Sequence, residues 1–550
     1  MKAMNKTAVL YCVVGLLPFL VPLVFTMQLS SVFTYYFALM SVLLLLLIMT
    51  FKGWLGKAIK LLFALSCLFS IVSLVLTGGL VSTGAFHSIL LTHSEEVIGY
   101  FELVNWYIMV PVFLSTAIGL YCFWKAYLPI QGWRRMTLLL SVLAVATALP
   151  VFKWNFDLEA KQQITEDYVH TLYLYQDTPA YNIFRVAALA FYERYQSHLS
   201  YGQDLPEHVL PDFSLDIPTN IVIVIGESSR RASYSLYGSQ INSSPKLKAR
   251  HIEDSNLVTV VDGVFAPAPN TRESVPRSFS FISANQMLYQ GLPYVNLIDF
   301  ARMMGYQTTW VTTQALYTRW DSFTAKVATS SDNVIHTGEP GQLWRDIDAA
   351  KAVVKQLNKD DGHQFVVLHL SGEHADYSVR NGEALPQAHF DAIKQQLTLA
   401  SDVSPIEIAY LSSVHFTDSI LDALISGLFK DEPNSLLVYF SDHGEVIGKG
   451  HGLQPIRIED ELAVPYLVFG SLGKNMSEVI NCYRDNQHLL FNSAYFPEVL
   501  LSTLGMKIEP PESTSEFTYY SVQGVTKTLP SDFSFEFYYP GQQQCRYNAH

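Results

Sequence analysis

Three apolar runs in the second half of the chain are each followed by residues that can bind a metal. The runs cover residues 221–225, 365–370 and 436–440, and the residues after them are Glu227, then Glu373 and His374, then Asp442, His443 and His451. Side chains that follow parallel strands meet at one edge of a sheet. A single Asp-His pair is more often a helix cap beside a solvated histidine, but the recurrence at three strand ends favours a shared metal site. Its oxygen and nitrogen donors suit Zn²⁺ or Mn²⁺.

Two hydroxyl groups lie between the first and second of these runs. Thr271 and Ser274 belong to the stretch 266–276, before a helix expected to begin near Ser274. A hydroxyl beside helix N-terminal amides is well placed to meet a phosphate, and a metal would make it nucleophilic. Capping of the helix by Thr271 and Ser274 explains the same residues equally well.

A sheet is required to position these groups, and the sequence predicts one. Short apolar runs alternate with helical periodicity, which is clearest at 342–358 and 406–429. This alternation is typical of a largely parallel sheet with helices on both faces. We therefore expect an α/β catalytic domain over residues 218–550.

The first 152 residues have a different composition, dominated by Leu, Val, Ile and Phe. Crossing a bilayer takes about 20 apolar helical residues. Five stretches qualify, which predicts an α-helical transmembrane domain over 1–152; they are Thr7 to Met27, Leu29 to Phe51, Ala58 to Leu80, Val104 to Trp124 and Met136 to Phe152. We interpret the first as a retained anchor and not a cleaved signal peptide, because a second span follows almost at once.

Basic residues in the short loops predict the orientation. Lys and Arg occur before the first span, around residues 52–60 and within 125–135, whereas the loop 81–102 has neither. Basic loops stay in the cytoplasm. The N-terminus is therefore predicted to be cytoplasmic, and everything after Phe152 to lie outside the cytoplasm.

The stretch 153–217 is rich in aromatic residues and ends near Pro211 and Pro218. Tyr favours the boundary between water and lipid. Interfacial linker helices are one interpretation, and ordinary helices on the soluble core are the other.

Charge and cysteine content restrict the function further. The net charge of −13 argues against a nucleic-acid partner, which would need a clustered basic surface. Cys12, Cys67 and Cys122 fall inside predicted spans. Cys482 and Cys545 belong to the outer part, where an oxidising compartment favours one disulfide over two unpaired thiols.

The complete order of motifs resembles that of the bacterial phosphoethanolamine transferases, inner-membrane members of the alkaline-phosphatase and sulfatase superfamily. The matching segments are N-I-V-I-V-I-G-E-S-S-R-R, N-T-x-x-S-V-P, S-G-E-H, S-D-H-G-E and H-G. The resemblance extends over nearly the whole chain, since that family also has five N-terminal spans and a periplasmic catalytic domain.

The resemblance implies roles for individual residues. Glu227, Thr271, Asp442 and His443 match the zinc-binding set, with Thr271 also the nucleophile. His374 and His451 match histidines that hold the substrate phosphate or a second metal, and one of them would protonate the leaving oxygen. The implied reaction moves phosphoethanolamine from phosphatidylethanolamine through a phospho-threonine to lipid A, a core sugar or another envelope glycan, and releases diacylglycerol.

The sequence departs from the family's pattern in three respects. His451 follows His443 by only eight residues, a shorter loop than the family commonly has. The outer part can form at most one disulfide, whereas members that modify lipid A often carry several. The nucleophile is flanked by Arg272, Glu273 and Arg277, more charge than expected.

Three alternatives are weighed against this prediction. A sulfatase-like hydrolase needs Cys or Ser followed by x-Pro-x-Arg, and in the stretch from Ser274 the arginine comes one position early. A phosphoglycerol transferase of the lipoteichoic-acid synthase type shares the spans and the threonine. A scaffold without chemistry should have lost a ligand or the nucleophile, and neither is missing here.

Overall fold

The structure, a computed structural model, describes the following parts of the 550-residue chain: 6–26, 32–77, 86, 106–130, 132–156, 184, 186–188, 202, 204–212, 217–253, 258–282, 288, 292–314, 323–336, 346–357, 362–374, 376–380, 383–397, 403–431, 434–448, 450, 458–470, 491–504, 506–508, 518–520 and 526–528. The chain forms two compact units. One contains residues 1–89 and 104–192, and the other contains 90–103 and 193–550. The predicted linker 153–217 lies mostly outside the described residues, so its interfacial helices stay a prediction.

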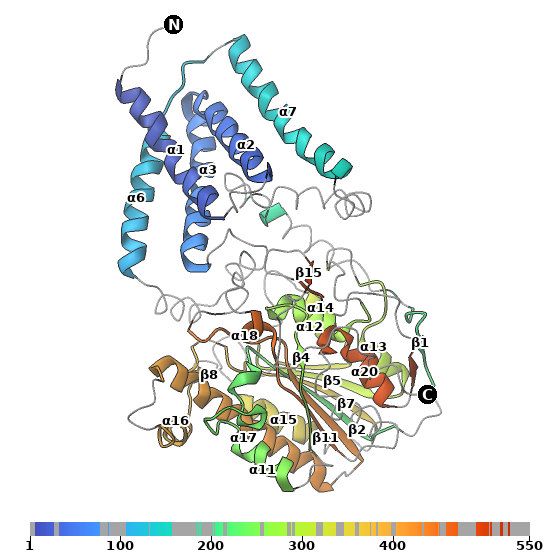
Figure 1. Cartoon of the computed structure of the whole chain (residues 1–550). Helices are drawn as coiled ribbons and strands as arrows, with labels where there is room; N and C mark the ends of the chain where they lie inside the picture. Colours follow the sequence, from blue (N-terminus) through green and yellow to red (C-terminus); the bar gives the residue numbers. More distant parts are fainter. Residues whose placement is uncertain are drawn as a thin grey trace. The chain divides into compact units, whose positions relative to one another are not determined.

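The described residues of the first unit include five long helices (Figure 1). They are α1 (Lys6–Thr26), α2 (Val32–Met49), α3 (Gly53–Thr77), α6 (Trp106–Lys125) and α7 (Trp133–Phe156). Each overlaps one predicted span. Glycines allow α1 and α6 to approach closely, since a Cβ on Gly15 would lie 2.7 Å from the Phe123 backbone and one on Gly119 would lie 2.1 Å from the Pro18 ring. Small residues at helix contacts are typical of membrane bundles.

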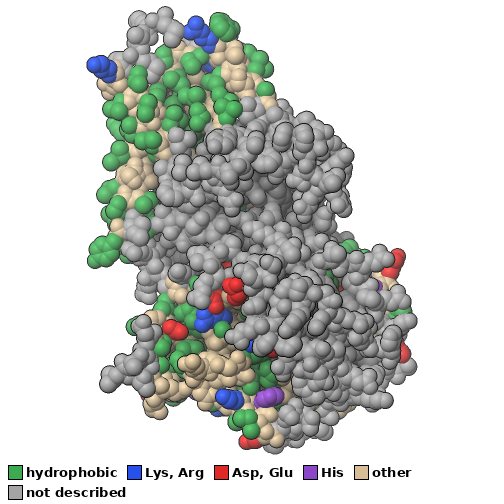
Figure 2. All heavy atoms as spheres, viewed as in Figure 1, with side chains coloured by type: hydrophobic (Ala, Val, Ile, Leu, Met, Phe, Trp, Pro, Cys, Tyr) green, Lys and Arg blue, Asp and Glu red, His purple; other side chains and the backbone are tan. Residues whose placement is uncertain are grey.

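The outer surface of this unit is apolar. Figure 2 shows hydrophobic side chains over its visible face, with Lys and Arg side chains at one end. Among the described residues, Gly53–Ser73 forms one apolar helix of 21 residues with mean hydropathy 1.9, long enough to cross a membrane. Lys6–Phe19 and Met109–Lys125 form shorter apolar helices. The count of five spans remains a prediction.

Two of the basic loops lie at the same end of the helical unit. The Leu128 amide donates to the Met49 carbonyl at 3.0 Å, and Lys52 lies over the Tyr127 ring at 4.5 Å. Helix α3 begins at Gly53, five residues before the predicted span. Lys60, which lies within the predicted span 58–80, is buried in this helix, and its ammonium donates to the Ala126 carbonyl just past the end of α6. A lysine is tolerated there because it satisfies an orphan carbonyl at a helix C-terminus.

A seven-stranded sheet forms the centre of the second unit, in the order β3-β11-β10-β2-β7-β5-β6. Strands β10, β2, β7, β5 and β6 are parallel, and β11 is antiparallel to both of its neighbours. The three predicted strands are the adjacent central ones, which confirms the α/β prediction. The strands are β2 (Asn220–Gly226), β3 (Val258–Val261), β5 (Gln307–Thr312), β6 (Asn333–His336), β7 (Gln364–His369), β10 (Ser435–Ser441) and β11 (Tyr466–Gly470).

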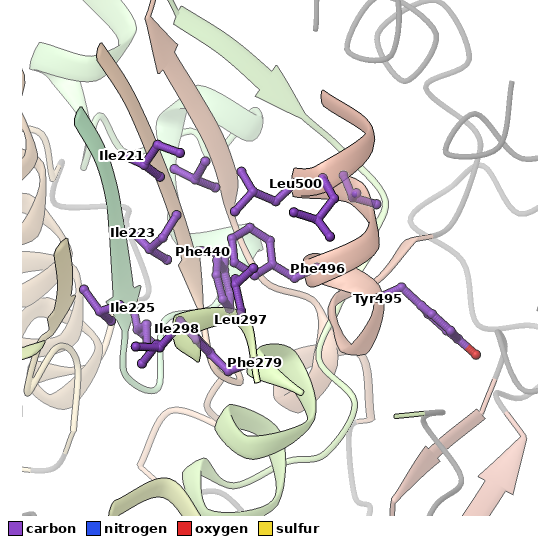
Figure 3. Packing of buried hydrophobic residues seen from close by; sticks show 14 of the residues in the cluster. Ile221, Ile223, Ile225, Phe279, Leu297, Ile298, Phe440, Tyr495, Phe496 and Leu500 are labelled. Carbon is purple, nitrogen blue, oxygen red and sulfur yellow. The ribbon is translucent and has the colours of Figure 1, made fainter. Parts of the chain in front are cut away.

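Side chains of β2 alternate between two hydrophobic cores, one on each face of the sheet. Ile221, Ile223 and Ile225 enter the core in Figure 3, and Val222 and Val224 enter the other. The first core is covered by α12 (Thr271–Phe279), α13 (Leu297–Met303), α14 (Phe323–Ala328) and α20 (Phe496–Thr503). The second is covered by α11 (Pro245–Glu253), α15 (Asp346–Leu357) and α17 (Pro405–Asp431). Burial on both faces explains why these strands read as continuous apolar runs.

Short elements complete the second unit. Four two-stranded pairs are β1 (Val209–Leu210) with β13 (Lys507–Ile508), β4 (Val264–Phe265) with β12 (Phe491–Asn492), β8 (Val379–Arg380) with β9 (Glu383–Ala384), and β14 (Thr518–Tyr520) with β15 (Thr526–Thr528). The remaining helices are α16 (Gln387–Lys394), α18 (Ile458–Leu462) and the 3₁₀ turns Arg231–Ser233, Ser235–Tyr237 and Ser493–Tyr495.

Gly226, the last residue of β2, has no room for a side chain. A Cβ on Gly226 would lie 2.7 Å from the Tyr439 hydroxyl oxygen, which is itself held by the Tyr234 hydroxyl at 2.8 Å. Gly226→Ala should therefore destabilise the protein by about 1–3 kcal/mol through overpacking. Adding Tyr439→Phe should restore part of the loss in a thermal unfolding experiment. A double variant no more stable than Gly226→Ala would contradict this explanation.

Candidate metal centre and nucleophile

Two adjacent strands deliver the acidic and histidine side chains of the site. Ser441 of β10 is paired with Gly226 of β2 in the parallel register, so the residues that follow the two strands emerge side by side. These are Glu227 on one strand and the Asp442-His443 pair on the other. The Asp442 amide also donates to the Gly226 carbonyl at 3.0 Å, which continues the ladder past the strand ends. The backbone of the sheet therefore fixes where these side chains begin.

The three side chains meet in a small buried cluster. One ligand atom from each of Glu227, Asp442 and His443 lies within 4.8 Å of the others, and all three residues are buried. His443 Nε2 is 3.0 Å from Glu227 Oε1 and 3.4 Å from Asp442 Oδ2. Asp442 Oδ2 is fully buried and accepts no hydrogen bond from the described residues.

The histidine orientation suits a bound cation. His443 Nδ1 lies 2.8 Å from the Gly444 carbonyl oxygen, so Nδ1 must carry a proton and donate it. In a neutral imidazole, Nε2 would then present its lone pair to two carboxylates, which is unfavourable unless a positive charge lies between them. A histidine whose other nitrogen donates to a backbone carbonyl is a common arrangement at metal sites. The cluster therefore fits a divalent cation of the zinc type.

The pKa values report the same excess of negative charge. Burial, reinforced by the negative charge of Glu227, raises the pKa of Asp442 well above its usual value. Burial alone would lower the pKa of His443, but the charges of Asp442 and Glu227 outweigh it and raise this pKa to about 10. Both shifts have the same cause, which is that two buried carboxylates have no cation to compensate their charges.

Thr271 adds a hydroxyl to this cluster. Its Oγ1 donates to Glu227 Oε2 at 2.7 Å and lies 3.4 Å from His443 Nε2. Thr271 is the first residue of α12, so the helix begins three residues earlier than the predicted start at Ser274. The reason is that Asn270 provides the N-cap, its side chain accepting the Glu273 amide at 3.0 Å.

The capping explanation of the two hydroxyls is therefore wrong. Asn270 caps the helix, which leaves the Thr271 hydroxyl to face Glu227 and His443. Ser274 is buried one turn further along and donates to the Asp442 carbonyl at 2.5 Å. One hydroxyl is presented to the cluster, and the other anchors α12 to the strand end that carries Asp442.

Two residues that the sequence did not single out support Glu227. Gln314, two residues past the end of β5, donates from Nε2 to Glu227 Oε2 at 2.8 Å and to the Leu370 carbonyl at 2.9 Å. Ser228 has a left-handed φ of 57° and donates from Oγ to Glu227 Oε1 at 3.1 Å. Such backbone strain is concentrated at functional sites. The strand-end rule applied to β5 could have found Gln314, but the threonine-rich strand was not recognised.

The remaining predicted residues lie on neighbouring loops. His374 is half-buried on the turn after β7, where the adjacent Glu373 amide donates to the Glu227 carbonyl at 2.8 Å. His451, Cys482 and Cys545 lie outside the described residues, and the three span cysteines are buried and free. The roles predicted for His374 and His451 stay predictions.

Known proteins share the fold of this chain. The structure of the integral membrane protein lipooligosaccharide phosphoethanolamine transferase A (EptA) from Neisseria meningitidis has the same overall fold, with a TM-score of 0.60 and 16% sequence identity over 93% of this chain and 96% of that one. The sulfatase family matches residues 219–505, more than half of the chain. The chain therefore belongs to the sulfatase family.

Sequence relatives of the chain include two named phosphoethanolamine transferases. EptC of Escherichia coli (strain K12) is 30% identical over 242 residues, which cover 43% of this chain and 41% of that protein. EptA of Helicobacter pylori is 24% identical over 438 residues, 74% of this chain and 75% of that protein. The chain thus matches about two fifths of the length of the E. coli relative and three quarters of the H. pylori one.

Zinc affinity should distinguish Asp442, a proposed metal ligand, from Gln314, which supports a ligand. Gln314→Leu removes one hydrogen bond to Glu227 and should weaken zinc binding by about tenfold to hundredfold, as expected for a residue behind the ligands. Asp442→Asn removes a ligand and should weaken it further. Competition with a chromophoric chelator would measure both in the detergent-solubilised full chain. Wild-type affinity in Asp442→Asn would disprove the ligand assignment.

His369 should make stability depend on acid pH. It ends β7, fully buried against Trp310, and neither ring nitrogen has a hydrogen-bond partner among the described residues. Burial lowers its pKa from 6.5 to about 4, although the negative charges of Glu227 and Asp346 oppose this. In the unfolded chain this imidazole is therefore protonated below pH 6.5, whereas in the folded protein it is protonated only below about pH 4.

The cost of keeping His369 neutral grows over that range to about 3 kcal/mol. His369→Leu should consequently lose less thermal stability than the wild type between pH 7 and roughly pH 4.5. Melting temperatures of the two metal-free proteins across this range would measure the effect, and parallel pH profiles would argue against it.

Proposed function

We propose that the protein is a metal-dependent phosphoethanolamine transferase that takes its group from phosphatidylethanolamine and passes it to an envelope glycan or lipid A. The observation that carries the proposal is the position of Thr271. Its hydroxyl lies within hydrogen-bonding distance of Glu227 and next to His443, at the N-terminus of α12. The family membership and the names of the two relatives support the same reaction.

Glu227, Asp442 and His443, with the Thr271 hydroxyl, would hold the metal. Zinc is the first choice for this donor set, and manganese is the second. When bound, it supplies a Lewis acid that lowers the pKa of the hydroxyl and stabilises negative charge on the substrate phosphate.

The first half of the reaction is an exchange at phosphorus. Thr271 Oγ1 forms a bond to phosphorus while the bond from phosphorus to the glycerol oxygen breaks. The hydroxyl proton passes toward Glu227 Oε2, 2.7 Å away, and the leaving oxygen of diacylglycerol gains a proton from His374 or His451. Thr271 lies at the N-terminus of α12, and the positive end of the helix dipole there would favour the negative charge of the phosphate.

The second half transfers the group onward. An acceptor oxygen attacks the phospho-threonine, the bond to Thr271 Oγ1 breaks, and the threonine recovers its proton. The same histidine gave up a proton in the first half, so it can now accept the proton of the acceptor hydroxyl.

The helical unit gives this chemistry a membrane location. We propose that its five helices span the inner membrane, with the basic loops in the cytoplasm and the catalytic unit in the periplasm. Exposed apolar side chains cover the helices, and the loops at residues 50–57 and 125–135 gather at one end, as the basic-loop rule requires. A lipid donor needs an active site that is attached to its membrane.

Intact-mass measurement tests the proposal directly. Full-length protein with zinc and phosphatidylethanolamine should gain the mass of one phosphoethanolamine group, and peptide mapping should place it on Thr271. Thr271→Ala should show no adduct and release no diacylglycerol above background. Ser278→Ala is the matched control, because it removes a hydroxyl from the same helix that contacts Ser493 and not the cluster, and it should keep the adduct.

The remaining outcomes discriminate between reaction classes. Release of diacylglycerol without an adduct would indicate a short-lived intermediate. An adduct formed only from phosphatidylglycerol would instead identify a phosphoglycerol transferase. An adduct that persists in Thr271→Ala would disprove the assignment of the nucleophile.

A further inference from the structure

Asp346 is a buried carboxylate that holds two turns behind the proposed site. It is the first residue of α15, and its side chain is fully buried. Its Oδ1 accepts the Ser371 amide at 2.9 Å, and its Oδ2 accepts the Gly372 amide at 3.1 Å. Two consecutive amides of the turn after β7 are therefore fixed by one side chain.

That turn presses against the backbone of Glu227. Gly372 has a φ of +50°, and a Cβ on it would lie 2.5 Å from both the nitrogen and the oxygen of Glu227. The next residue, Glu373, donates its amide to the Glu227 carbonyl at 2.8 Å, and His374 follows. Any displacement of the turn would shift Glu227 and His374 together.

Asp346 also fixes the turn after β5. Thr313 Oγ1 donates to Asp346 Oδ1 at 2.7 Å and lies 3.0 Å from Ser371 Oγ. The neighbouring residue is Gln314, whose amide group donates to Glu227 Oε2. One carboxylate thus connects the turn that supports the Glu227 backbone with the turn that supports its side chain.

We infer that Asp346 is a positioning residue: it sets the placement of Glu227 and His374 by holding the turns after β7 and β5. The inference rests on the proposed metal site, because Glu227 is one of its ligands. Asp346 itself neither binds the metal nor touches the substrate. Its removal should weaken metal binding and slow the chemical step, while the affinity for the lipid donor changes little.

Asp418 provides a matched control in the same protein. It is equally buried, and it also accepts two consecutive amides, those of Lys246 at 3.0 Å and Leu247 at 2.9 Å, at the start of α11. Asp418→Asn and Asp346→Asn make the same chemical change, since each places an amide NH₂ where a carboxylate oxygen received an N–H. Only the second change lies behind the proposed site.

The experiment compares the two variants as full-length proteins in detergent. We expect both to lose melting temperature, and only Asp346→Asn to bind zinc about tenfold more weakly in competition with a chelator. With phosphatidylethanolamine, kcat for diacylglycerol release should also fall about tenfold or more in Asp346→Asn, with KM nearly unchanged.

The outcomes separate this inference from the proposed function. Wild-type protein that binds no zinc would overturn the proposed site and the inference with it. Wild-type protein that binds zinc, with equal affinity and kcat in the two variants, would overturn the role of Asp346 alone. If Asp346→Asn does not fold, Thr313→Val decides. It leaves the carboxylate in place and removes the contacts of Thr313 Oγ1 with Asp346 Oδ1 at 2.7 Å, Ser371 Oγ at 3.0 Å and the His369 carbonyl at 3.4 Å. It should weaken zinc binding in the same direction, and wild-type affinity in this variant would count against the inference.

Discussion

The burial of two carboxylates beside one another is the constraint on which the site depends. Glu227 and Asp442 emerge from adjacent parallel strands, out of contact with bulk water, and both face His443 Nε2. Two buried negative charges at this separation are unfavourable unless a positive charge compensates them. The raised pKa of His443 is the response of the metal-free protein. A divalent cation would compensate both charges and leave the imidazole neutral, so the geometry that is costly without a metal would become favourable with one.

The fold keeps these charges together because little around them can move. The strands that carry them are buried on both faces, and Gly226 and Gly372 leave no room for a side chain. Gln314, two residues past β5, holds the Glu227 side chain, whereas Ser274 of α12 and the Glu373 amide hold the backbone carbonyls of Asp442 and Glu227. The Glu227 carboxylate also accepts the Ser228 and Thr271 hydroxyls. It therefore cannot easily rotate away from its neighbours, and a bound cation would relieve the repulsion.

Sequence patterns predicted the site residues that directly follow a strand in the sequence. Glu227, Asp442 and His443 follow apolar runs directly, so a local pattern and the parallel sheet were enough to bring them together. The start of α12 was missed because Asn270, and not a hydroxyl, supplies its cap. Asp346 is 119 residues from Glu227 in the chain, and it acts through backbone amides that carry no side-chain signature. Lys60 was counted among the basic residues around the loop between the second and third spans, although it lies within the predicted span 58–80; in the structure it is buried in α3, and a carbonyl just past the end of α6 compensates its burial.

The charged side chains around Thr271 also neutralise one another. Arg272, Glu273 and Arg277 looked like an unusual surplus of charge beside the nucleophile. In the structure, the buried Arg277 donates to Glu273 Oε2 at 2.7 Å, and Arg272 lies 3.7 Å from Glu273 Oε1. Glu273 is thus neutralised along α12 and adds no net negative charge beside Thr271. Since the negative charge near the hydroxyl comes from the two carboxylates of the cluster, a cation bound there and the amides of α12 would both favour an incoming phosphate.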